Sequence, residues 1–169
     1  YCAAIRERIG PCEEGDYNHF GVARSEGMLR LRNEALGHLG RAEYGKCMYL
    51  ESKNGYAAVD VRKWKCNRFV ADIAIDAGFQ VPKNQTVPIF GNTYPPIAND
   101  WARGTGLGDW RHLGGVYPEP GFVVGRYNPK GSGHCGIVDY DGWTISAREN
   151  GVGRNAKKML DGTIKYNVK

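Results

Sequence analysis

The sequence has 169 residues, 41% of them hydrophobic, and a formal net charge of +5. This length fits one domain with its own core, and no run approaches the ~20 apolar residues that span a membrane. The basic residues are scattered, without the arginine-rich run or lysine-loaded helix face typical of nucleic-acid binding. We therefore expect no membrane and no nucleic-acid partner. The positive charge suits an anionic partner but does not identify it, because bacterial cell walls are anionic as well as nucleic acids.

The start of the chain differs in character from the rest. It begins at Tyr1 instead of Met, with no charged and apolar leader, so we expect a processed or trimmed form. We predict a single domain over residues 1–169, in which about 1–60 form an N-terminal extension or subdomain and 61–169 the core.

Two local patterns stand out within the extension. From residue 25 to about 44, leucines and a methionine alternate with charged residues, which predicts an amphipathic helix loosened by Gly37 and Gly40. Two short apolar runs follow on either side of Asn54-Gly55, a dipeptide typical of the turn in a β-hairpin.

The segment from Lys65 to Gly78 carries the strongest helix pattern. Its apolar residues recur at i, i+3, i+4, i+7, i+8 and i+11 from Cys66, which predicts a buried stripe, with Asp72 and Asp76 on the opposite face. Gly78 supplies the C-terminal stop. Cys66 therefore lies in the first turn, where free backbone N–H groups and the helix dipole favour a thiolate. The alternative is that Cys66 is a small core residue.

The next segment contains four prolines between residues 81 and 96, so we expect an irregular excursion that builds a substrate cleft. The residues from Ile97 to Ala102 predict a short helix capped near Asn99 or Asp100. Aromatic residues nearby are either cleft walls or ordinary core. These residues are Tyr94, Trp101 and Trp110.

From residue 117 onward the pattern predicts an antiparallel meander. Three apolar runs, at 122–124, 135–138 and 143–147, are separated by glycine- and proline-containing turns. His134 stands at the entry of the second run. Because side chains alternate along a strand, we expect His134 and Cys135 to point to opposite faces and not to share a site.

Cys66 and His134 are the residue types of a nucleophile and its base. An imidazole can take the thiol proton and later protonate the leaving amine. The sequence contains no CxxC or HExxH spacing, so we expect no metal and no cofactor.

Four cysteines remain when Cys66 is set aside: Cys2, Cys12, Cys47 and Cys135. In a secreted protein they could form two disulfides, with three possible connectivities. The alternative is a reduced cytosolic protein with four free thiols. We expect secretion, to the exterior or to a bacterial cell wall or periplasm.

Several short motifs occur together between residues 64 and 151. They read Lys-Cys-Asn-x-Phe-Val at 65–70, Ala-Asn-Asp-Trp at 98–101, Pro-Gly-x-Val-Val at 120–124, Gly-His-x-Gly-Ile-Val at 133–138 and Thr-Ile-Ser-Ala at 144–147. This combination resembles the NlpC-type and CHAP-type papain-like cell-wall amidases, which include amidase toxins that bacteria use against rivals. The resemblance implies an α+β fold, with the nucleophile helix packed on an antiparallel sheet.

The resemblance also implies roles for individual residues. Cys66 and His134 match the catalytic cysteine and histidine. The third residue, which orients the imidazole, is usually His, Asn, Gln or Asp; here that strand offers Ser146, with Glu149 and Asn150 just beyond it. For substrate binding we expect three further residues, Trp101, Asn67 and Tyr94.

The predicted function is therefore a cysteine peptidase or amidase that cleaves amide bonds in the peptide stems of peptidoglycan. Two alternatives use the same residues differently. An acyltransferase would pass the acyl group to a lipid or an amine, and a basic cell-wall-binding module would not need Cys66 at all.

Overall fold

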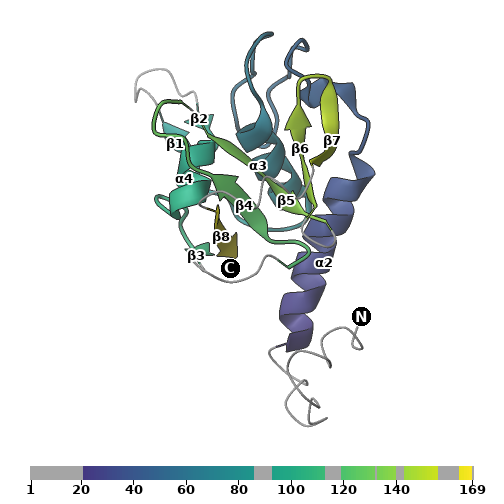
Figure 1. Ribbon diagram of the computed structural model, residues 1–169, viewed down its shortest axis with the longest axis vertical. Helices are drawn as coiled ribbons and strands as arrows, with labels where there is room; N and C mark the ends of the chain where they lie inside the picture. The colour runs from purple at the N-terminus through teal and green to yellow at the C-terminus, as the bar shows by residue number, and fades with distance from the viewer. Residues whose placement is uncertain are drawn as a thin grey trace.

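The computed structural model describes residues 21–85, 93–112, 119–131, 133–139, 143–155 and 164–168. These residues form an α+β fold of helices packed on an antiparallel sheet. Figure 1 shows α3 behind the sheet, with α2 along one side and α4 along the other. Within the described ranges, no helix is long and apolar enough to cross a membrane.

The first helix of the described residues, α2 (Gly21–Gly37), covers residues 25–37 of the segment predicted as an amphipathic helix. It ends well before residue 44, at one of the two glycines expected to loosen it, and Gly40 follows with a φ of 81°. Leu31 and Ala35 are buried in the core. The chain then makes the short 3₁₀ helix η1 (Ala42–Tyr44).

The turn at Asn54-Gly55 is confirmed. Both residues have positive φ, 57° and 78°, as the tightest hairpin turns require. The flanking residues pair only through isolated bridges, Leu50 with Val59 and Lys53 with Tyr56, so the segment is a hairpin turn without extended strands.

Helix α3 (Cys66–Asp76) confirms the central prediction, and Cys66 is its first residue. The expected burial of its apolar stripe is also found. One part of the prediction is wrong: Asp72 is fully buried, because the segment before the helix folds over this side and supplies it with polar partners.

The proline-rich segment is less irregular than predicted. Its described ends form a short antiparallel pair, β1 (Asn84–Gln85) and β2 (Thr93–Tyr94), with the residues between them outside the described ranges. The predicted short helix is α4 (Ala98–Arg103). The Asp100 carboxylate accepts a hydrogen bond from the Ile97 N–H at 3.0 Å and so caps its first turn.

The main sheet contains six strands in the order β3-β8-β4-β5-β6-β7, all antiparallel. The predicted meander corresponds to three of them, and sequence patterns missed the other three. The strands are β3 (Arg111–His112), β4 (Val123–Arg126), β5 (His134–Val138), β6 (Thr144–Arg148), β7 (Gly151–Asn155) and β8 (Ile164–Val168).

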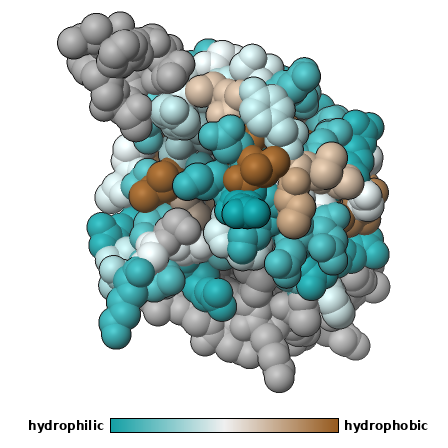
Figure 2. All heavy atoms as spheres, turned by 90° about the horizontal axis from the view of Figure 1, so that it is seen from above, coloured by the Kyte–Doolittle hydropathy of each residue, from teal (hydrophilic) through white to brown (hydrophobic). Residues whose placement is uncertain are grey.

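Residues on the two faces of the sheet belong to different apolar clusters. Val123, Cys135 and Ile137 share the main core with α3 and α4. Val124 and Val138, one position along each strand, pack instead with Phe122 and reach Met28 of α2. This is the two-residue alternation of a strand. Figure 2 shows a face on which hydrophilic residues dominate and apolar residues form small separate groups.

The cysteines correct the disulfide prediction. Cys47 and Cys135 are both free, the first exposed and the second buried inside the sheet, so neither forms the predicted bridge. Cys2 and Cys12 lie outside the described residues. The division of the chain near residue 60 stays a prediction; the described part of the extension packs on α3, β5 and β7.

Candidate active site

Cys66 lies at the start of α3, next to the start of β5. Its side chain is almost fully buried, with 4% of the residue exposed. Three groups lie close enough to the sulfur to lower its pKa: the Cys135 thiol, the His134 side chain and the Cys135 backbone N–H. The hydrogen bond from the Cys135 thiol, followed by the bond and charge of His134, lowers the pKa of Cys66 well below its usual range, although burial acts to raise it.

His134 is the first residue of β5 and is only partly buried. Its Nε2 lies 3.0 Å from the hydroxyl of Ser146 on the neighbouring strand β6. Because Nε2 is engaged there, Nδ1 is the nitrogen left to face Cys66. The structure therefore brings Cys66, His134 and Ser146, the three predicted catalytic residues, into one contiguous line.

The position of Cys135 corrects a prediction. Alternation places His134 and Cys135 on opposite faces of β5, yet both contact the sulfur of Cys66. Cys66 lies where the strand begins, so it can contact residues from both faces. Burial, together with the adjacent Cys66 sulfur, raises the pKa of Cys135 well above its usual range, which keeps this thiol protonated as a donor.

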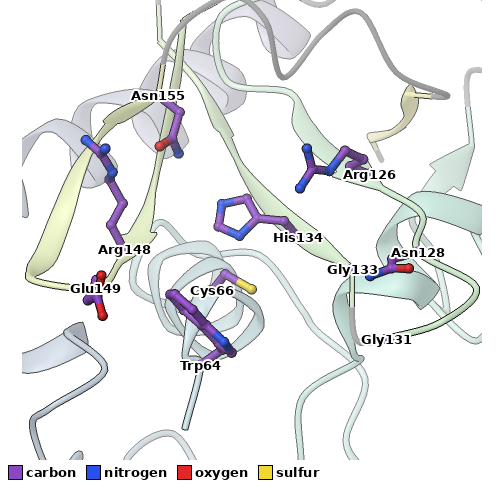
Figure 3. A pocket seen from close by; sticks show the side chains of 10 residues that line it. All are labelled: Trp64, Cys66, Arg126, Asn128, Gly131, Gly133, His134, Arg148, Glu149 and Asn155. Atoms are coloured by element: carbon purple, nitrogen blue, oxygen red, sulfur yellow. The ribbon is translucent and has the colours of Figure 1, made fainter. Parts of the chain in front are cut away.

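A cavity of about 540 Å³ opens above this line of residues. Figure 3 shows His134 above Cys66, with Trp64 in front, Arg126 on one side and Asn155 and Arg148 on the other. The remaining lining residues are Asn128, Gly131, Gly133 and Glu149. Cys66 is therefore buried in the protein but lines a cavity that is open on one side.

Asn99 of α4 holds one wall of this cavity. Its amide nitrogen donates to the carbonyl groups of Asn128 and Gly131, at 3.1 and 2.8 Å, and its amide oxygen accepts from the Asn128 N–H at 3.0 Å. These bonds fix the loop that leads into His134. Asn99 of the Ala-Asn-Asp-Trp motif therefore stabilises one wall of the cavity from behind.

The predicted substrate-binding residues do not line the cavity. Trp101 is fully buried and packs edge-on against Trp110, with 5.0 Å between ring centroids, so it belongs to the core. Tyr94 is part of the short strand β2 and half-buried, and Asn67 is half-buried on the first turn of α3. Of the alternatives for the third catalytic position, Glu149 lines the cavity, whereas Asn150 is exposed on the turn before β7.

Sequence patterns missed most of the cavity lining, including Trp64, Arg126 and Asn155. Trp64 precedes Cys66 by two residues, which could have been noticed. Arg126 lies directly opposite His134 in the β4–β5 register, and its guanidinium has no ion-pair partner in the part of the chain that the structure describes. Asn155 comes from β7, which the predicted meander did not contain.

One other group has metal-ligand types. Ligand atoms of Glu34, His38 and Asp76 lie within 4.8 Å of one another. Spacing along the chain could not show this, because Asp76 comes from a different helix. The Lys53 ammonium lies 2.5 Å from the Asp76 carboxylate, and His38 Nδ1 lies 3.0 Å from the Glu34 carbonyl. Glu34, His38 and Asp76 therefore already have polar partners within the protein.

Comparisons with known proteins give a fold and no family. No family model matches the sequence, and no curated protein matches it either. Two solved structures are similar: Rv1477, described as a hypothetical invasion protein of Mycobacterium tuberculosis, and a mutant of the Resuscitation Promoting Factor Interacting protein RipA. Their TM-scores are 0.57 and 0.58, each at 14% identity over 98% of this chain and 78% of theirs. The chain therefore shares the α+β fold of these two proteins.

Proposed function

We propose that this protein is a cysteine hydrolase that cleaves amide bonds in the peptide stems of bacterial peptidoglycan. One observation carries the proposal: Cys66 and His134 line the same open cavity, and His134 and the Cys135 thiol lower the pKa of the Cys66 thiol. A depressed thiol pKa beside an imidazole in a cleft is the arrangement of an activated nucleophile.

The first half of the reaction forms an acyl-enzyme. The Cys66 thiolate attacks the carbonyl carbon of the scissile amide, and the oxygen develops negative charge. Backbone N–H groups in the first turn of α3 have no partner within the helix and can donate to this oxyanion. His134, protonated at Nδ1, then gives this proton to the leaving amine as the C–N bond breaks.

The second half returns the enzyme to its starting state. His134, now neutral at Nδ1, takes a proton from a water molecule, whose oxygen attacks the thioester carbonyl. The C–S bond breaks and the carboxylic acid leaves. Throughout both halves Nε2 keeps its proton and donates to Ser146, so Ser146 orients the ring without exchanging a proton.

Two features support peptidoglycan as the substrate. The motifs from Lys65 to Ala147 resemble those of NlpC-type and CHAP-type amidases, and the fold matches RipA and Rv1477. The cavity also carries two arginines, Arg126 and Arg148, against one carboxylate, Glu149. An excess of positive charge in a cleft raises the local concentration of an anionic substrate. We further propose that the protein is secreted, to the exterior or to a bacterial cell wall or periplasm, because a peptidoglycan substrate lies there.

Digestion of purified peptidoglycan tests this function. The wild-type protein should release peptide fragments whose masses identify the bond that is cut, and Cys66→Ala should release none. Fragments carrying an added amine or lipid in place of water would identify an acyltransferase. Wall binding that is equal for both proteins, without any fragments, would contradict hydrolysis and indicate a binding module.

A further inference from the structure

The hydroxyl of Ser146 has a second partner besides His134. The Asn155 side chain donates from Nδ2 to the same oxygen, Ser146 Oγ, that lies 3.0 Å from His134 Nε2. Ser146 is fully buried, whereas Asn155 is partly buried and lines the cavity. Three side chains from three consecutive strands therefore form one hydrogen-bonded line. Figure 3 shows its two ends, Asn155 and His134, with His134 next to Cys66.

The register of the sheet places these groups together. Ser146 lies opposite Gly153 across β6 and β7, and Asn155 lies opposite Thr144. Side chains two positions apart on one strand share a face, so Asn155 is the diagonal neighbour of Ser146. On the other side, a Cβ atom added to Gly136 would lie 2.9 Å from the Ser146 Cβ and 2.7 Å from the Ile145 carbonyl oxygen. Because Gly136 has no side chain, Ser146 can pack closely against the strand that carries His134.

A serine alone is an ambiguous partner for a catalytic imidazole. A hydroxyl has one proton and two lone pairs, so it can accept from Nε2–H or donate to a bare Nε2. Only the first arrangement leaves Nδ1 of the neutral ring free to take a proton from Cys66 or from water. Donation to Nε2 would place the proton of the neutral ring on Nδ1 and block the base. A carboxylate or an amide oxygen at the third position does not have this ambiguity.

Asn155 holds this oxygen in place. Its amide donates to one lone pair of Ser146 Oγ and leaves the other lone pair to accept from Nε2–H. We propose that Asn155 is a positioning residue that acts through Ser146 to fix the orientation of the His134 ring. The proposal rests on the proposed function only in that it takes Cys66 and His134 as nucleophile and base.

Alkylation of Cys66 by iodoacetamide provides a test that needs no substrate. The alkylation rate is plotted against pH. The change at low pH (the lower limb) reports formation of the thiolate, and the change at high pH (the upper limb) reports loss of the proton from His134. Peptide mass analysis assigns the modification to Cys66. Asn155→Ala should move the upper limb to lower pH. Asn155→Asp should move it to higher pH, because a carboxylate only accepts and leaves Ser146 Oγ free to accept from Nε2–H.

Turnover of peptidoglycan gives the second readout. Asn155→Ala should lower kcat about three- to tenfold, the effect of one neutral hydrogen bond, with KM unchanged. Asn155→Asp should recover most of this loss. Asn33→Ala, an exposed asparagine on α2, is the matched control and should leave the alkylation profile and the kinetic constants unchanged.

Three results would overturn the inference. If both limbs of the alkylation profile stay at the wild-type pH in Asn155→Ala, Asn155 has no effect on His134. An Asn155→Asp variant as impaired as Asn155→Ala, with both folded by circular dichroism, would show a structural role only. A wild-type profile with no depressed lower limb would remove the Cys66–His134 pair itself. If the variants shift the alkylation profile as expected but the wild-type protein does not cleave peptidoglycan, the proposed substrate is wrong and the role of Asn155 is still supported.

Discussion

Helix α3 carries two buried polar clusters that differ in how completely they are closed. At its first turn, the sulfur of Cys66 meets Cys135 and His134 beneath an open cavity. One turn further on, Arg68 and Asp72 form an ion pair at 2.8 Å that is 1% and 0% exposed. The first cluster keeps a reactive atom accessible from one side. The second cluster does not line the cavity, and its ion pair holds parts of the fold together.

The bonds of the second cluster show what it ties together. Asp72 accepts hydrogen bonds from Arg68 Nε, from the Tyr44 hydroxyl at 3.2 Å and from Asn54 Nδ2 at 3.1 Å. Burial raises the pKa of Asp72, against the Arg68 charge and these bonds, which lower it. The other Arg68 nitrogens donate to three backbone carbonyl groups, those of Glu51, Lys53 and Ala57. These bonds therefore connect residues 44–57 to α3, the helix that begins with Cys66.

Loss of the reactive groups in the first cluster should have the largest effect. We expect Cys66→Ala and His134→Ala to lower peptidoglycan cleavage by at least about 10³-fold, because each removes a group that takes part in bond breaking. Both variants should remain folded by circular dichroism, since the second cluster is intact. Appreciable cleavage by either folded variant would show that the open cluster is not the catalytic one.

Loss of the ion pair in the second cluster should act on stability instead. Arg68→Met keeps the length of the side chain but leaves Asp72 buried without its charge partner. We expect the free energy of unfolding to fall by about 3–5 kcal/mol, measured by urea denaturation. Arg30→Met, an exposed arginine on α2, is the control. A loss below about 1 kcal/mol would show that the pair is not a structural tie.

The contrast between the clusters also explains what the sequence could predict. The apolar spacing after Cys66 predicts α3 correctly because helical periodicity depends on near neighbours in the chain. The same pattern places Asp72 in solvent, since it cannot show that Tyr44 and Asn54 fold over that side. Burial of a polar residue depends on partners far away in sequence, which no local pattern contains.

The sheet follows the same rule. Strands β4, β5 and β6 have clear apolar runs and were predicted, whereas β7 (Gly-Val-Gly-Arg-Asn) has two glycines and two polar residues, and little β-propensity. Missing β7 also meant missing Asn155 and its bond to Ser146. Cys66 and His134 were identified because each is the first residue of a recognisable element. Arg126 is near the site because it pairs with His134 across β4 and β5, and Cys135 because it lies at the start of β5. No local sequence pattern shows either placement.

Removal of the Cys135 thiol should have an intermediate effect on the open cluster. Cys135→Ala takes away the S–H donor that contributes most to lowering the pKa of Cys66, so that pKa should rise. Each unit of the rise lowers the thiolate fraction up to about tenfold at a pH below the pKa. Cys135→Ser keeps a hydroxyl donor and should show a smaller shift.

The measurement is the rate of Cys66 alkylation between mildly acidic and alkaline pH, followed by peptide mass analysis. Cys47 is exposed and free in the same protein, so it serves as an internal reference. In the wild-type protein Cys66 should react before Cys47 at acidic pH. Equal lower limbs for the wild type and Cys135→Ala would show that His134 alone sets the pKa of Cys66.

The smallest expected effect concerns the third position of the open cluster. Ser146→Ala removes a neutral hydrogen bond to His134 Nε2, worth about 0.5–1.5 kcal/mol, so turnover should fall by about tenfold or less. Glu149 and Asn150 are the competing orienting residues, and Glu149 already lines the cavity. If one of them holds the ring during catalysis, Ser146→Ala will be silent and Glu149→Ala or Asn150→Ala will carry the loss. Cleavage assays on the three variants, at matched folding, decide between these assignments. Because the only hydrogen bond from Nε2 within the described residues goes to Ser146, we expect the loss to follow Ser146.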